Sequence, residues 1–78
     1  MEVERYIIEL ENGNFAKFEQ ENEGEIWVYD YRDFLMATNF HKEDAEEVFS
    51  EFLEGDYYWS FVSDYRPKAI RKITATLE

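Results

Sequence analysis

The chain of 78 residues is predicted to fold as one small α+β domain. We expect an antiparallel sheet of roughly three to five strands, covered on one face by a main α-helix. Three observations predict this class: segments near both ends have strand-like alternation, one central segment has helical periodicity, and no linker, repeat or low-complexity tract divides the chain. The expected order of elements is β-β-β-α-β, within a single acidic domain over residues 1–78.

The first expected element is a hairpin followed by a third strand. Tyr6–Leu10 is rich in β-forming residues, and Phe15–Phe18 returns as the second strand. Between them, Asn12-Gly13 is the dipeptide preferred where both central turn residues need positive φ. After a turn that contains a glycine, Glu25–Tyr31 is expected to form the third strand, with apolar side chains on both faces.

Two segments have ambiguous patterns. Phe34–Phe40 is expected to be extended, either as a continuation of the third strand past a bulge near Arg32-Asp33 or as a separate fourth strand. Asp56–Tyr65 matches both a short helix and a strand, because its aromatic residues fit either period. Pro67 ends that segment, since proline disfavours helical geometry in the residue before it. Ala69–Leu77 then alternates as a final strand.

The central helix is expected over Lys42–Glu54. Its first turn contains Glu43 and Asp44, where the helix dipole favours anions, and Gly55 is suited to the position after its end. The apolar residues of this segment recur at the spacing of one helical stripe that faces a core. They are Ala45, Val48, Phe49, Phe52 and Leu53.

The acidic residues are concentrated in the middle of the chain. Nineteen residues are Asp or Glu against eight Lys or Arg, which gives a net charge of −11. Fourteen of the acids and two cations, Arg32 and Lys42, lie between Glu19 and Asp64, so this segment carries −12 and the remainder +1. Like charges on a small domain repel one another. The excess is therefore expected to serve solubility, steering or binding to a cationic partner.

Composition also limits the class and the compartment. The chain has no cysteine, so disulfides and thiolate metal sites are excluded, and aromatic residues (19%) provide the bulk of the core instead. No signal sequence is recognisable at the start. The longest uncharged run, Phe34–His41, is too short to span a bilayer. We expect a cytoplasmic protein with no membrane partner.

Catalytic motifs are missing from the sequence. It contains no phosphate-binding glycine loop, no zinc-binding His pair and no calcium loop. His41 is the single histidine and lies at the expected helix boundary, and the serines have neither a Cys nor a second His to form a relay. We therefore expect a protein that is not an enzyme and uses neither cofactor nor metal.

Two acidic arrays have the spacing of a binding surface. In an extended segment, alternate residues project to one side about 6–7 Å apart, and neighbours on a helical ridge are about 5–6 Å apart. Both spacings approximate the separation of successive phosphates along a nucleic-acid strand, so a rigid carboxylate array could occupy the same basic groove. The first array comprises Glu19, Glu21, Glu23 and Glu25, and the second comprises Glu43, Glu47, Glu51 and Glu54.

Each of these features also has a simpler interpretation. An acidic helix face is most often a solvated surface, although an ordinary soluble surface mixes both signs of charge. The aromatic residues outside the helix exceed what one sheet face can bury, and Trp27 and Trp59 would serve as interface anchors if exposed. Alternatively, Asp56–Tyr65 covers the second sheet face and buries them. The basic residues near the end of the chain are expected to pair with acids of this domain rather than with nucleic acid. They are Arg66, Lys68, Arg71 and Lys72.

In composition and layout the chain resembles small, acidic, cysteine-free proteins of bacteriophages and other mobile elements. The resemblance lies in the hairpin Tyr6–Phe18 around Asn12-Gly13, in Ala37-Thr38-Asn39-Phe40 leading into the helix, and in the closing strand Ile70–Leu77. That group includes anti-CRISPR proteins, anti-restriction proteins and uracil-DNA glycosylase inhibitors, many of which mimic DNA. The resemblance implies an inhibitor of a nucleic-acid-processing enzyme and transfers no site residue.

The sequence therefore predicts an acidic protein, monomeric or homodimeric, that blocks a basic nucleic-acid-binding site on a host enzyme. The alternative is a structural or regulatory interaction module, perhaps a homodimer, whose charge serves solubility. The expected partner-binding residues are Glu43, Glu47, Glu51, Glu54, Glu19, Glu21, Glu23, Trp27 and Trp59.

Overall fold

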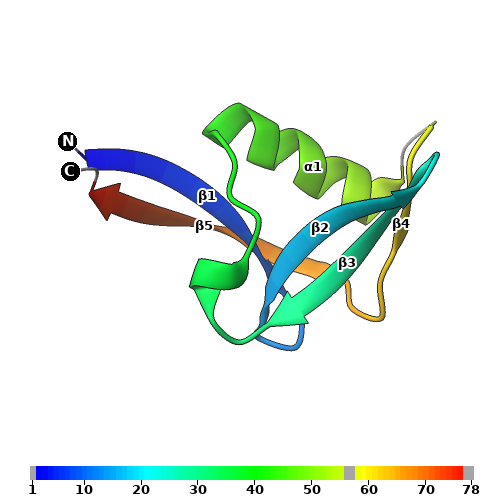
Figure 1. Ribbon diagram of the computed structural model, residues 1–78, viewed down its shortest axis with the longest axis horizontal. Helices are drawn as coiled ribbons and strands as arrows, with labels where there is room; N and C mark the ends of the chain where they lie inside the picture. The colour runs from blue at the N-terminus through cyan, green and yellow to red at the C-terminus, as the bar shows by residue number, and fades with distance from the viewer. Residues whose placement is uncertain (1, 56–57, 77–78) are drawn as a thin grey trace.

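The computed structural model describes residues 2–55 and 58–76, which form a mixed sheet and a helix that lies along one side of it (Figure 1). Within these residues the sheet has five strands in the order β4-β3-β2-β1-β5. The expected α+β class is therefore confirmed. The elements in chain order are β1 Glu2–Leu10, β2 Phe15–Asn22, β3 Glu25–Tyr31, the 3-10 helix η1 Phe34–Met36, α1 Lys42–Glu54, β4 Ser60–Val62 and β5 Pro67–Thr76.

One strand pair departs from the expected antiparallel arrangement. β3 and β4 are parallel, whereas the β1–β2, β1–β5 and β2–β3 pairs are antiparallel. The chain leaves β3, crosses through η1 and α1, and returns beside β3 in the same direction. Parallel neighbours require such a crossover. The expected β-β-β-α-β order thus gains a short strand between the helix and the last strand.

The β1–β2 hairpin forms where expected, but with a different turn. The Leu10 carbonyl accepts from Gly13 N–H at 2.9 Å, and Leu10 N–H donates to the Asn14 carbonyl at 2.8 Å. Gly13 has φ 88°, and among the described residues positive φ occurs only at glycines. Asn12 is therefore not left-handed, and the expectation that both residues need positive φ was wrong. The loop is a three-residue type that places glycine at its left-handed position.

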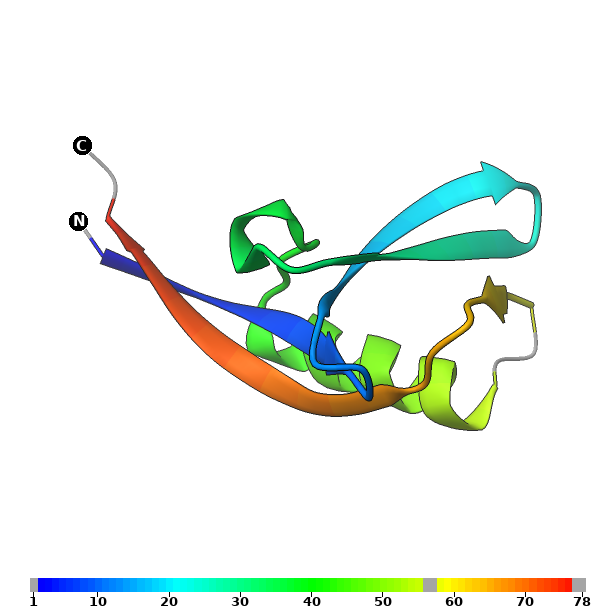
Figure 2. The same ribbon diagram turned by 90° about the horizontal axis from the view of Figure 1, so that it is seen from below.

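Beyond the hairpin, β1 and β2 separate, and the segment before α1 lies between them. Figure 2 shows the β1–β5 and β2–β3 ribbons diverging. Phe40 exchanges both backbone hydrogen bonds with Tyr6 of β1 (2.8 and 2.9 Å). On the other side, Thr38 N–H donates to the Ala16 carbonyl at 3.1 Å, and Thr38 Oγ1 accepts from Phe18 N–H at 2.8 Å. This segment satisfies backbone groups that the separated strands would otherwise leave unpaired.

The expectation that Phe34–Phe40 is extended throughout was wrong for its first half. Residues Phe34–Met36 form η1, because Asp33 caps the turn and its Oδ1 accepts from Leu35 N–H at 2.9 Å. Aspartate is a preferred residue at this capping position. The segment is therefore neither a continuation of the third strand nor a separate fourth strand. After η1, Phe40 forms only an isolated bridge with Tyr6.

The core lies between α1 and the sheet. Ile8, Leu10 and Ala16 are fully buried there. Phe18 is central among the aromatic residues, with ring centroids 5.7 Å from Phe40, 5.7 Å from Phe52 and 6.1 Å from Phe61, all edge-to-face. Such packing adds to the area that the rings remove from water.

The helix has the predicted bounds, with His41 at its N-cap and Gly55 at its C-cap. Ala45 is buried, and Val48 packs against the core. Leu53 is 37% exposed, so including it in the core stripe was wrong. It lies at the edge of the stripe, where the helix surface turns away from the sheet.

The remaining segments resolve the other expectations. Within Asp56–Tyr65 the described residues contain the strand Ser60–Val62, while Tyr57 lies outside them. β5 begins at Pro67, a position where a strand tolerates proline, and Leu77 lies outside the described residues.

The expected pairing of the basic residues with acids of the domain is confirmed for three of them. These pairs are Arg66–Glu11 (3.8 Å), Arg71–Glu9 (2.8 Å) and Lys72–Glu4 (3.5 Å).

Candidate functional site

The face of the β2–β3 ribbon that points away from α1 carries both acids and aromatic rings. Glu19 is the cross-strand partner of Trp27, and Lys17 is the partner of Tyr29. Partners share a face, whereas the next residue along each strand points to the other side. Since Phe18 packs toward α1, these four residues point away from the helix. We call this surface, comprising Glu19, Glu21, Trp27 and Tyr29 together with the adjoining Glu23–Tyr58 pair at the β2–β3 turn, the acidic–aromatic face.

Two tyrosine hydroxyls hold two of the acids in place. Tyr29 donates to Glu21 Oε1 at 2.6 Å, and Tyr58 donates to Glu23 Oε1 at 3.1 Å. Hydrogen bonds to a charged acceptor are stronger than those between neutral groups. The carboxylates of Glu21 and Glu23 are thus oriented on rigid phenol rings, and each keeps a second oxygen for another donor.

The hydrogen bond to Glu21 also raises the pKa of the Tyr29 hydroxyl. Its hydrogen bond to Glu21, together with partial burial and the nearby negative charges of Glu21 and Glu19, raises the pKa of Tyr29 to about 12. A phenolate beside a carboxylate is disfavoured because both are negative. The Tyr29 hydroxyl therefore remains a donor to Glu21 throughout the physiological range.

A shallow depression of about 360 Å³ lies in this face, lined by Glu21, Asn22, Trp27 and Tyr29. The Trp27 side chain is 39% exposed there. Tryptophan and tyrosine dominate binding energy in protein interfaces, because they combine large apolar area with a hydrogen-bonding group. A guanidinium or ammonium group that enters the depression would meet the Glu21 carboxylate and the ring faces together.

One cation lies at the edge of the acidic–aromatic face. Lys17 Nζ is 3.7 Å from Glu19 Oε1, and both side chains are substantially exposed. An exposed pair of this kind contributes little to stability and breaks readily. Glu21 and Glu23 make their side-chain bonds to neutral hydroxyls instead. Their charge is therefore available to a partner.

The second predicted array lies on the opposite side of the sheet. Glu43, Glu47 and Glu54 are exposed on α1, and Glu51 is half-buried. Within the described part of the chain, no hydrogen bond or ion pair holds the carboxylates of Glu43, Glu47 or Glu54. Since α1 covers the face that points away from Glu19 and Trp27, the two arrays cannot contact one flat partner surface together.

The structure thus groups some of the predicted site residues and separates others. Glu19, Glu21, Glu23 and Trp27 belong to the acidic–aromatic face, whereas the helix array stands apart. Trp59 is half-buried beside Tyr58, with ring centroids 5.0 Å apart, so it supports that ring rather than standing free.

The expected site residues did not include Tyr29 and Tyr58, although both belong to the excess of aromatic residues from which Trp27 and Trp59 were chosen as anchors. For Tyr29, the sequence does contain an indication. A short turn at Gly24 brings the strand that contains Tyr29 back alongside Glu21. For Tyr58 no local signal exists, since it follows α1 and reaches Glu23 across 35 residues. Such a contact depends on the crossover that makes β4 a neighbour of β3.

The polar groups of the acidic–aromatic face are suited to contacts with cationic side chains. Among residues 2–55 and 58–76, no cluster of three or more His, Asp or Glu side chains is placed to hold a metal ion. The polar groups present are carboxylates and phenols, which accept from and donate to a partner. Their arrangement can recognise arginine and lysine side chains, which carry several donors each.

Comparisons with known protein families, with curated proteins and with solved structures find no match to this chain. In the described ranges, no helix combines the length and the apolar composition that crossing a bilayer requires.

Proposed function

We propose that this protein is a non-catalytic inhibitor, encoded by a phage or another mobile element, that blocks a basic nucleic-acid-binding site of an enzyme in the host cytoplasm. The observation that carries the proposal is the pair of tyrosine–glutamate hydrogen bonds at 2.6 and 3.1 Å. They hold two carboxylates in a set geometry, and Glu21 lines the same depression as the exposed Trp27. Preorganised groups lose less entropy on binding than mobile ones do.

Charge supports the same proposal. The net charge of −11 would attract a basic groove from a distance and would repel nucleic acid itself. On contact, the acids of the acidic–aromatic face would take the place of phosphates, and Trp27 would anchor the complex. Binding should therefore weaken steeply as salt rises, because mobile ions screen these contacts.

The test compares the two acidic arrays with matched charge changes. The bait protein captures partners from host lysate, and the captured protein is then assayed for duplex-DNA binding with and without the bait. We expect the double variant Glu21→Lys and Glu23→Lys to weaken capture and DNA displacement by about tenfold or more. The control, Glu43→Lys with Glu47→Lys, has the same net charge and should retain most of the affinity.

The outcomes separate the proposal from its alternative. If both double variants lose affinity equally, net charge acts alone and the arrangement of the acidic–aromatic face is irrelevant. If neither loses affinity, or if the captured partner still binds DNA, the charge serves solubility and the protein is an interaction module of another kind. Trp27→Ala adds a further check, with a loss of about 30-fold expected for an interface anchor.

A further inference from the structure

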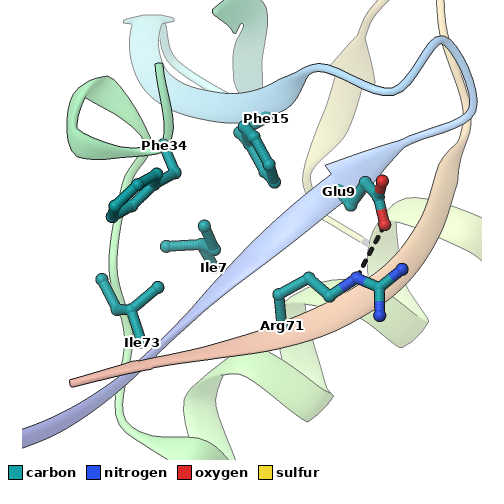
Figure 3. A pocket seen from close by; sticks show the side chains of 6 residues that line it. All are labelled: Ile7, Glu9, Phe15, Phe34, Arg71 and Ile73. Atoms are coloured by element: carbon teal, nitrogen blue, oxygen red, sulfur yellow. Dashed lines mark hydrogen bonds and ion pairs between the residues drawn. The ribbon is translucent and has the colours of Figure 1, made fainter. Parts of the chain in front are cut away.

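A separate apolar hollow lies at the other end of the same sheet face. It has a volume of about 210 Å³ and is lined by Ile7, Glu9, Phe15, Phe34, Arg71 and Ile73 (Figure 3). The side chains come from β1, β2, η1 and β5, and Phe15 and Phe34 meet edge-to-face at 6.4 Å. Since η1 follows β3 and the acids of the acidic–aromatic face cluster at the turn before β3, the two surfaces lie at opposite ends of that strand.

The helix η1 beside the hollow presents three consecutive apolar residues to solvent. Leu35 is 74% exposed, and Phe34 and Met36 are 45% and 46% exposed. Apolar side chains gathered in this way mark an interaction site, because a monomeric soluble protein rarely leaves a contiguous apolar patch open. We call the hollow together with Leu35 and Met36 the η1 surface.

Charge on the η1 surface is close to balanced, unlike the charge on α1 and on the acidic–aromatic face. The Glu9 and Arg71 side chains form an ion pair at 2.8 Å at the rim of the hollow, with Glu9 only 14% exposed. Arg5 is the cross-strand partner of Ile73 and so lies on the same face. A second copy of this acidic chain would be repelled at the helix or at the acidic–aromatic face, but not here.

We propose that two copies of the chain associate through the η1 surface about a two-fold axis, with Leu35 of each copy in the hollow of the other. A two-fold interface requires a self-complementary patch, and this patch has a projecting side chain next to an apolar recess. The recess of about 210 Å³ is larger than an engineered apolar cavity of about 150 Å³ that accepts benzene, so it has room for a leucine side chain. The association is independent of the acidic–aromatic face, which stays open.

The edge of β5 is the competing surface for self-association. It is ten residues long and lies at the end of the sheet. Lys68 and Lys72 are both exposed on it, and lysine on an edge strand opposes pairing with a second copy. The η1 surface lacks this obstacle.

The first test is the oligomeric state measured by sedimentation velocity over a range of protein concentrations. Wild type should dimerise, and Leu35→Asp should raise the dimer dissociation constant by more than about 100-fold, because each dimer buries two copies of the side chain. The control Leu53→Asp changes the same residue type on α1 and should have little effect. Circular dichroism of each variant checks that the fold is retained.

The dependence of binding on salt concentration distinguishes the proposed dimer from the proposed inhibitor function. An apolar interface between two acidic chains should strengthen or stay unchanged as salt rises, whereas inhibitor binding should weaken. A dimer that dissociates at high salt would overturn the present proposal and leave the other standing. A protein that stays monomeric at every concentration, or a dimer insensitive to Leu35→Asp, would also overturn it.

A second measurement locates the contact directly. The chain has no cysteine, so Leu35→Cys provides one attachment point for a nitroxide label. Labelled protein is mixed with unlabelled, ¹⁵N-enriched protein, and the broadening of amide signals in the second copy is recorded. Broadening at Ile7, Phe15 and Ile73 is the expected result. Broadening confined to the β5 edge around Lys68 would overturn the assignment.

Discussion

The two faces of the β2–β3 ribbon differ in what holds their aromatic residues. On the covered face, Phe18 contacts the rings of Phe40, Phe52 and Phe61. On the open face, Tyr29 donates a hydrogen bond through its hydroxyl to the carboxylate of Glu21. The same strands therefore carry a hydrophobic core on one side and a polar, charged surface on the other. Substitutions on the first face test folding, and substitutions on the second test binding.

The largest expected effect is on the covered face. Phe18→Ala should lower the free energy of unfolding by about 3–5 kcal/mol, because it removes a ring from the centre of the aromatic core and leaves a cavity. A domain of this size has a stability of about the same magnitude, so most of this variant should be unfolded. Urea denaturation followed by circular dichroism measures the change.

Trp27→Ala is the matched substitution on the open face. Surface changes away from special features usually alter the free energy of unfolding by no more than about 0.5 kcal/mol. We expect a small change in stability, and the loss of partner binding described above. Equal destabilisation by the two variants would show that the open face is also part of the core.

A smaller effect is expected where β1 and β2 separate. Thr38→Val keeps the shape of the side chain but removes the acceptor for Phe18 N–H. The free energy of unfolding should fall by about 1 kcal/mol. Thr74→Val, at an exposed position of β5, is the control in the same denaturation experiment. If the two variants are equally stable, Thr38 does not support the separated strands.

The hydrogen bond between Tyr29 and Glu21 on the open face should also be measurable as a raised pKa of Tyr29. The pKa of Tyr29 is raised to about 12 by the hydrogen bond to Glu21, so the phenol should ionise about two units above its ordinary value of 10.0. Ultraviolet titration of wild type, with Tyr29→Phe subtracted, isolates this residue. Glu21→Gln should move its midpoint toward 10.

The direction of the accompanying stability change follows from the same shift. The folded-state pKa of Tyr29 lies above the unfolded value. The contribution of the protonated Tyr29 to the free energy of unfolding is therefore fully present below pH 10 and is lost as pH rises through about 12. A midpoint near 10 in the subtracted titration would mean that the bond to Glu21 does not form in solution.

The smallest expected effect concerns the hairpin end of the ribbon. Asn14 and Asn12 donate to Asp30 Oδ2 at 2.8 and 3.0 Å, and these bonds lower the pKa of the Asp30 carboxyl from 3.8. The contribution of these hydrogen bonds to the free energy of unfolding is therefore present above pH 3.8. It is lost as pH falls through the lower folded-state pKa of Asp30. Asn14→Ala should slightly flatten the acid limb of the stability–pH profile, and Asn39→Ala should not. Identical profiles for the two variants would contradict this assignment.

Local patterns predicted the elements that depend on short sequence separations. The stripe that includes Val48 and Phe52 gave the helix its bounds, and the glycine at position 13 marked the first hairpin. Helical and strand periods express the repeat of the backbone itself, so they can be recognised without knowledge of the remaining structure. The errors at Asn12 and Leu53 concern details that the neighbouring elements determine.

The features that were missed depend on distant contacts. The insertion of Thr38–Phe40 between β1 and β2 requires those strands to separate, and the parallel β3–β4 pair requires the crossover through α1. The bond from Tyr58 to Glu23 follows from that crossover. Within the candidate site, the sequence indicated the acids and an excess of aromatic residues, but not that Glu19 and Glu21 share one face with Trp27 and Tyr29.

The amino-acid sequence by itself determined a small, acidic α+β domain in which strand alternation separates core residues from surface residues. Only the tertiary structure decided which sheet face α1 covers, and hence that Glu21 and Trp27 are open together while the helix acids lie on the other side. The physical reason is that periodicity fixes which residues share a face, whereas packing between distant elements decides which face is buried.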